Sequence, residues 1–114
     1  MLNTWDKLHS AAVELAGTGP IKQRLFGAYV HHLAELSEEQ VPKEVREDFC
    51  ALMRTLRSVR PLPGEDAVRA TVRKMSDGEA NRCAVQIVNM FGAVSRTQTA
   101  RASQPVSVVQ LHAS

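Results

Sequence analysis

Cysteine is scarce in this sequence, which contains only Cys50 and Cys83. Neither belongs to a CxxC or CxxH pair, and two cysteines are too few to cross-link a small scaffold. This excludes a disulfide-rich secreted domain and a zinc-finger framework. We therefore expect both to be small apolar core residues in a reducing compartment, and we predict a cytoplasmic protein.

Long apolar runs and catalytic signatures are also missing. No apolar stretch approaches the roughly 18 to 20 residues that a membrane-spanning helix needs, so no membrane association is predicted. The sequence contains no GxSxG, no phosphate-binding loop and no GxGxxG. We therefore predict a protein that is not an enzyme and that has no catalytic residues and no cofactor.

Aromatic residues are few: they make up 4% of the 114 residues, whereas hydrophobic residues of all kinds make up 44% and charged residues 23%. The last two values are close to those of globular proteins, and the length is that of one ordinary domain. The core must therefore be built from aliphatic side chains.

Apolar residues recur at intervals of three and four rather than in strand alternation. Helices are predicted over residues 4–16, 20–36, 42–59, 65–75 and 77–96. Their number and short connectors predict an all-α fold, a compact bundle of about five helices. The bundle should occupy residues 1–97 as a single helical domain. The polar segment 98–114, which contains Pro105, should be a flexible tail.

Two local signals mark helix ends. Gly17 is expected to end the first helix in the left-handed conformation that favours glycine. Ser76 and Glu79 have capping-box spacing, which predicts a helix start at Asp77. On this last helix, the residues expected to face the core are Ala80, Cys83, Ala84, Ile87, Val88, Phe91 and Val94.

The apolar stripes on the second and fifth predicted helices are wide. A five-helix monomer of this size is not expected to bury so much apolar surface. We therefore predict a homodimer.

Charge is unevenly distributed along the chain. The formal net charge is +2, but residues 1–50 carry three more acidic than basic side chains, and residues 51–114 carry five more basic than acidic ones. Such asymmetry is typical of a face that meets an anionic partner. The candidate binding residues are Arg54, Arg57, Arg60, Arg69, Arg73, Lys74 and Arg82. The leading hypothesis is a small non-enzymatic helical interaction module whose partner is a protein, bound through the basic surface of the third and fourth predicted helices. Pairing of these cations with nearby acids within the chain is the opposing interpretation.

The alternative hypothesis is a dimeric nucleic-acid-binding regulator that uses a helix-turn-helix-like corner within residues 65–90. Cations surround this corner, and Asn81, Gln86 and Asn89 are of the types that read base edges. However, the first turn of the last predicted helix carries two carboxylates where phosphates would approach. They are better explained by the helix dipole. The sequence therefore favours an ordinary helical corner.

The histidines were considered as metal ligands. His31 and His32 are adjacent, and adjacent side chains on an α-helix point about 100° apart, so they are not expected to share one ion. His32 lies on an apolar stripe and should be buried and hydrogen-bonded to a backbone carbonyl. A site built from His9, His32 and Glu35 lacks HxxxH or ExxH spacing. We therefore predict no metal site.

Overall fold

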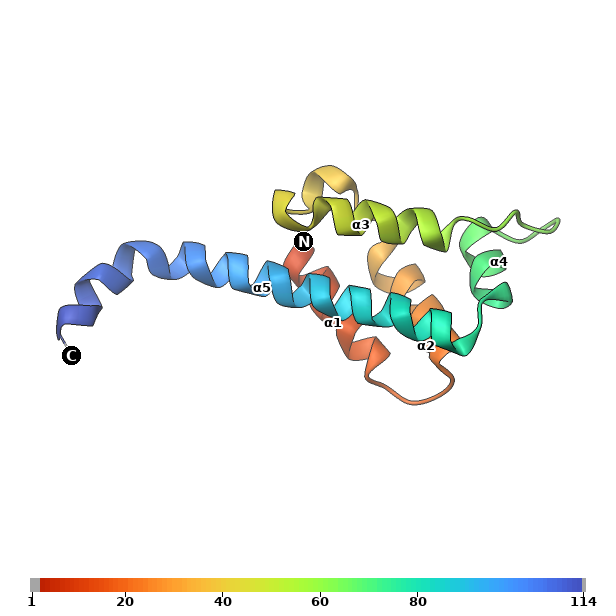
Figure 1. Ribbon diagram of the computed structural model, residues 1–114, viewed down its shortest axis with the longest axis horizontal. Helices are drawn as coiled ribbons and strands as arrows, with labels where there is room; N and C mark the ends of the chain where they lie inside the picture. The colour runs from red at the N-terminus through yellow and green to blue at the C-terminus, as the bar shows by residue number, and fades with distance from the viewer. Residues whose placement is uncertain (1–2, 114) are drawn as a thin grey trace.

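The computed structural model describes residues 3–113 of the chain, with side chains up to residue 97. Every regular element in this part of the chain is helical, which confirms the predicted all-α fold (Figure 1). The elements are α1 (Thr4–Leu15), α2 (Ile21–Ala28), the π-helical turn η1 (Tyr29–Leu33), the 3-10 turn η2 (Glu38–Gln40), α3 (Lys43–Leu56), α4 (Ala67–Lys74) and α5 (Asp77–Ala113). Over the described residues, no helix combines the length and the apolar character needed to cross a bilayer.

The first half of α5 is the centre of the bundle. It packs against α1, α2 and α3, while α4 packs on α2 and α3 and closes one end (Figure 1). The core is mainly aliphatic, as predicted, although Phe49 is also buried in it. Its most deeply buried large side chains are Leu8, Leu25, Leu33, Val41, Leu52, Leu56 and Ile87.

The last helix is longer than predicted. It was expected to end near residue 96, but its helical backbone continues to Ala113 and extends away from the bundle (Figure 1). The predicted end lay where apolar periodicity stops, and periodicity reports packing rather than helix formation itself. Residues 97–104 contain neither glycine nor proline, so no local signal stops the helix there. The side chains of the predicted tail, 98–114, lie outside the described residues, and its flexibility stays a prediction.

The end of α1 also differs from the prediction. Ala16 caps α1 in the right-handed α region, and among the described residues positive φ occurs only at Gly19 (96°) and Gly64 (81°). The chain turns into α2 at Pro20, which has a φ of −60°. The left-handed residue is therefore Gly19, directly before that proline, and the assignment to Gly17 is wrong.

The buried face of α5 was predicted with two errors. Val88 is 45% exposed, whereas Met90, which was not expected in the core, is 2% exposed. Ile87, Met90 and Val94 follow the three-four spacing of one helix face. Val88 lies about 100° around the helix from Ile87 and so faces away from the bundle.

The capping box at the start of α5 is confirmed. The Ser76 N–H donates to Glu79 Oε1 over 2.8 Å, and the Glu79 N–H donates to Ser76 Oγ over 3.1 Å. The bond from the Ser76 N–H to the carboxylate is the main reason that the pKa of Glu79 is lowered. Both bonds satisfy backbone donors that a helix start leaves without partners.

Candidate functional site

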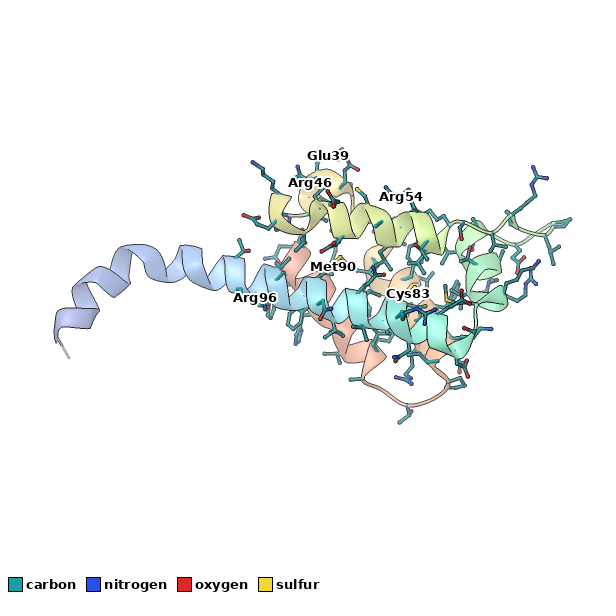
Figure 2. The ribbon with its side chains drawn as sticks, in the orientation of Figure 1. Glu39, Arg46, Arg54, Cys83, Met90 and Arg96 are labelled. Carbon is teal, nitrogen blue, oxygen red and sulfur yellow. The ribbon has the colours of Figure 1, made fainter. Side chains whose placement is uncertain are left out.

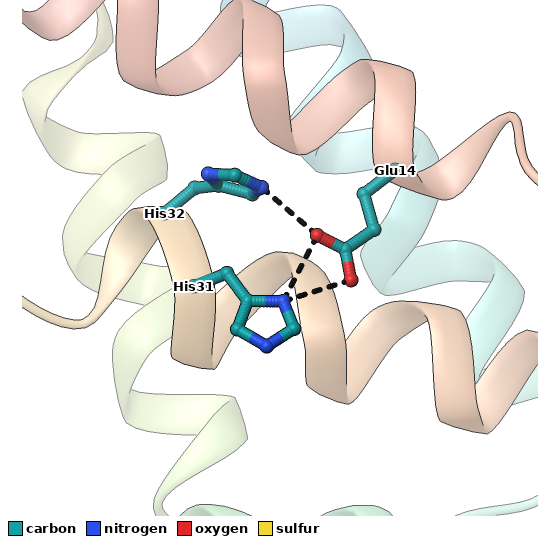
Figure 3. A group of neighbouring side chains, drawn as sticks. All are labelled: Glu14, His31 and His32. Carbon is teal, nitrogen blue, oxygen red and sulfur yellow. Dashed lines mark hydrogen bonds and ion pairs between the residues drawn. The ribbon is translucent and has the colours of Figure 1, made fainter.

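A carboxylate on α1 lies between two histidines of η1 (Figure 3). His32 Nε2 is 2.8 Å from Glu14 Oε1, and His31 Nδ1 is 3.0 Å from Glu14 Oε2. We call Glu14, His31 and His32 the Glu-His-His cluster. One expectation is corrected here: His32 is partly exposed and bonds to a carboxylate rather than to a backbone carbonyl. The two adjacent histidines contact the same carboxylate.

Both rings come from the π-helical turn η1. Consecutive side chains on an α-helix are about 100° apart, and a turn closed by an i to i+5 bond is wider, which narrows that angle. Here the Ala34 N–H donates to the Tyr29 carbonyl over 2.8 Å. His31 and His32 lie inside this turn, and η1 packs against α1. Turns of this kind occur frequently at functional sites.

Gly27 on α2 provides the space for the carboxylate. It is buried, and a Cβ at this position would overlap Glu14 Oε2. The cluster therefore depends on three segments: α1 supplies the carboxylate, η1 supplies the rings, and α2 approaches without a side chain.

Solvent reaches the cluster. The His31 side chain is 63% exposed, and those of His32 and Glu14 are 25% and 28% exposed. An open hollow beside the cluster is lined by His9, Ser10, Val13, Glu14 and His32. This arrangement can hold a proton or a cation between ring nitrogens and a carboxylate.

Sequence reasoning did not find Glu14. It lies on a different helix from the histidines, and no local spacing connects them. His9, the other histidine of the site weighed from the sequence, is not part of the cluster. Its ring stacks on Trp5 with 4.9 Å between ring centroids. Glu35 is exposed and lies outside the cluster.

All seven predicted cationic residues are exposed. Among the side chains described, only Arg73 of these seven forms an ion pair: its Nε and Nη2 donate to Glu65 over 2.8 and 3.0 Å. These bonds, with a further one from the Leu62 N–H, lower the pKa of Glu65 to about 2. The same pair raises the pKa of Arg73. Internal pairing therefore accounts for one of the seven within residues 3–97.

Two of the predicted arginines lie against aromatic rings of one helical face. The Arg69 guanidinium is 4.4 Å from the ring centroid of Phe26. Arg57, at the C-cap of α3, donates to the Tyr29 hydroxyl over 3.1 Å, and its guanidinium is 5.9 Å from that ring centroid. Phe26 and Tyr29 are three residues apart, so they share a side of α2 and η1. We call these four residues the arginine-aromatic surface.

Of the remaining predicted cations, which form no ion pair within residues 3–97, only Arg54 lies next to the arginine-aromatic surface. Arg54, on the outer face of α3 (Figure 2), shares a hollow with Arg57 and two acidic residues, Glu38 and Glu39. The other three lie elsewhere: Lys74 and Arg82 line a cavity of about 600 Å³ that α3, α4 and α5 form, and Arg60 is exposed in the loop after α3.

The corner between α4 and α5 is tight. Only Met75 and Ser76 separate the two helices, and Met75 is buried. A helix-turn-helix usually has a turn of three or four residues. The first part of α5 is also packed into the bundle through buried residues that include Cys83 and Ile87.

The two cysteines are free thiols. Cys83 is buried, as expected, and this burial raises its pKa. Cys50 is only half-buried, and its thiol donates to Glu38 Oε2 over 3.1 Å, which raises the pKa of Cys50. Both therefore stay protonated near neutral pH, which makes them poor nucleophiles.

No family model matches this chain, and no curated protein or solved structure is significantly similar to it. Its function is therefore argued from its own residues.

Proposed function

We propose that this protein is a non-enzymatic helical interaction module that binds an acidic segment of a partner protein at the arginine-aromatic surface. The observation that carries the proposal is the convergence of Arg57 and Arg69, from different segments, on the rings of Tyr29 and Phe26.

Stacking on a ring restricts a guanidinium without neutralising its charge. Less side-chain freedom is then lost when a carboxylate binds. Arginine and tyrosine are also enriched among the residues that dominate binding energies at protein interfaces. Arg57 and Arg69 have no ion pair within residues 3–97, so both retain donors for a partner.

Two observations weigh against the nucleic-acid alternative. Asp77 and Glu79 are exposed in the first turn of α5, where a recognition helix would meet phosphates. The buried face of α5 is also needed for the core. Neither the acidic first turn nor the buried face of α5 favours insertion of this helix into a DNA groove.

Charge-matched double variants test the proposal. Arg57→Gln/Arg69→Gln and Lys74→Gln/Arg82→Gln each remove two positive charges, but only the first pair belongs to the arginine-aromatic surface. Fluorescence anisotropy with a labelled Glu/Asp-rich peptide should show about tenfold weaker binding for the first pair, because arginines are enriched among the few residues that dominate binding, and tenfold corresponds to about 1.4 kcal/mol. The second pair should bind nearly as well as the wild type.

Equal losses for the two double variants would mean that net charge alone drives binding, and the proposed surface would be wrong. Labelled duplex DNA serves as the competing probe. Tighter binding to DNA than to the peptide, with a steep loss as salt rises, would favour the nucleic-acid alternative.

We further propose that the protein acts in the cytoplasm as a homodimer. The free thiols of Cys50 and Cys83 suit a reducing compartment. Val85 and Val88 are 48% and 45% exposed, three residues apart on α5, and form the apolar strip that a second copy would cover.

A further inference from the structure

We propose that the Glu-His-His cluster is a binding site for a divalent first-row transition metal ion such as Zn²⁺. Two imidazoles and one carboxylate are the protein ligands of open zinc sites, in which water or substrate completes the coordination. This inference goes beyond the proposed interaction surface: the two sites share no residue, although Tyr29 lies in the same η1 turn as the histidines.

The distances suit coordination after small side-chain movements. With bonds of 2.0 to 2.1 Å, ligand atoms around a tetrahedral Zn²⁺ lie about 3.3 Å apart. The ring nitrogens of His32 and His31 are now 2.8 and 3.0 Å from oxygens of Glu14, and the three ligand atoms lie within 4.8 Å of one another. An ion between them needs only a slight outward shift of side chains that are partly exposed.

The backbone around the cluster holds the ligands in place. The π-helical turn carries both histidines, and their rings reach the same carboxylate. Gly27 leaves room for the Glu14 carboxylate between α1 and α2. Metal sites need ligands oriented by their surroundings, and both features meet that need.

Metal binding requires both ring nitrogens that face Glu14 to be free of hydrogen. Ring nitrogens that donate N–H groups to Glu14 carry hydrogen, whereas a metal needs the lone pairs of His31 Nδ1 and His32 Nε2. A neutral ring moves its hydrogen to the other nitrogen through solvent, and a protonated ring releases one proton. Binding should therefore weaken as the pH falls.

The consequence for the fold is a cross-link between α1 and η1. Because an ion that binds only the folded state stabilises it, Zn²⁺ should raise the thermal unfolding temperature. At least one coordination position should remain open, since solvent reaches the cluster. The neighbouring hollow could admit a small anion or a partner's side chain to that position.

The test uses the untagged full chain. Isothermal titration with Zn²⁺ should show one ion per chain, and Co²⁺ should give visible absorption bands of a low-symmetry site. Glu14→Gln, His31→Gln and His32→Gln should each weaken Zn²⁺ binding by more than about tenfold, since even the loss of a residue that only orients a metal ligand costs about 10- to 100-fold.

Matched controls are available in the chain. Glu35→Gln removes an exposed carboxylate outside the cluster, and His112→Gln removes a histidine near the C-terminal end of α5. These variants should bind Zn²⁺ like the wild type. Circular dichroism of every variant checks that the helices remain.

A second measurement needs no variant. In ¹⁵N-labelled wild-type protein, Zn²⁺ should shift the resonances of His31 Nδ1 and His32 Nε2 more than those of the other histidines. Absence of Zn²⁺ binding at micromolar concentration, or binding that survives loss of Glu14 or of both η1 histidines, would overturn the proposal. The cluster would then be a hydrogen-bonded contact between α1 and η1 only.

Discussion

The carboxylate of Glu14 on α1 lies directly over the α-carbon of Gly27 on α2, in the space that a side chain at residue 27 would fill. This contact places an acidic group between two helices and beside the rings of His31 and His32. A side chain at residue 27 should therefore affect the stability of the fold and the binding of a metal ion differently.

Gly27→Ala should impair the cluster more than the fold. Alanine favours a helix interior by about 0.5 to 1 kcal/mol over glycine, but here its Cβ must displace the Glu14 carboxylate. Because Glu14 is a flexible side chain, the two effects should nearly cancel in the free energy of unfolding measured with urea. Zn²⁺ affinity should fall.

Gly92→Ala is the matched control for this change. A Cβ at residue 92 meets only the Arg96 side chain, at 3.5 Å, so the full helix-propensity gain should appear. If Gly27→Ala stabilises the protein as much as Gly92→Ala and leaves metal binding intact, Glu14 does not occupy the position described.

Glu65→Gln should lower stability at neutral pH. The pKa of Glu65 is about 2 in the folded protein, below its ordinary value of 4.5. A carboxyl group with a lowered folded pKa stabilises the protein above 4.5, and this contribution is lost as the pH falls toward 2. Urea unfolding curves of wild type and variant should therefore differ at pH 7 and converge in that acidic range. A difference that does not depend on pH would rule out the charged pair with Arg73 as its source.

Ser76→Ala should destabilise the protein by about 1 kcal/mol, because it removes the side chain that caps α5. Ser76→Asp keeps an acceptor at the cap and should retain most of the stability. Chemical denaturation measures both. Equal stability of the two variants would show that the cap contributes little in this protein.

Cys50 should react slowly with a thiol reagent such as DTNB at neutral pH, and Cys83 only after unfolding. The hydrogen bond to Glu38 is the main reason that the pKa of Cys50 is raised. Glu38→Gln should therefore lower that pKa and speed the reaction of Cys50, since the thiolate is the nucleophile. An unchanged rate would mean that access, rather than Glu38, limits the reaction.

Light scattering at micromolar concentration should give about twice the monomer mass of 12.5 kDa. Val85→Asp/Val88→Asp should reduce it to the monomer value, because burying two carboxylates is unfavourable. Leu62→Asp is the control, since Leu62 is 57% exposed but lies in a loop. A monomeric wild type contradicts the homodimer.

Local patterns predicted the helices well because their signals are contained in neighbouring residues. The spacing of Val68, Val72 and Met75 placed them in the core, where the structure has them. The capping pair Ser76 and Glu79 marked the start of α5. Two predictions of finer detail were wrong. Val88 was placed on the buried face of α5, which depends on small differences in angle around the helix. Gly17 was given the left-handed conformation, which depends on where the next helix begins.

The candidate metal site could not be predicted in this way. His31 and His32 were visible, but they lie in a π-helical turn that apolar periodicity does not reveal. Their partner Glu14 comes from another helix, and its position depends on Gly27. In the same way, the charges of Arg57 and Arg69 were apparent, but their stacking on Tyr29 and Phe26 was not.

The amino-acid sequence by itself determined an all-helical chain with an aliphatic core and a surplus of exposed arginines, because periodicity, capping and charge are properties of short segments. Only the tertiary structure decided which side chains from separate helices meet, since those contacts depend on how the helices pack and on where one of them widens by a residue.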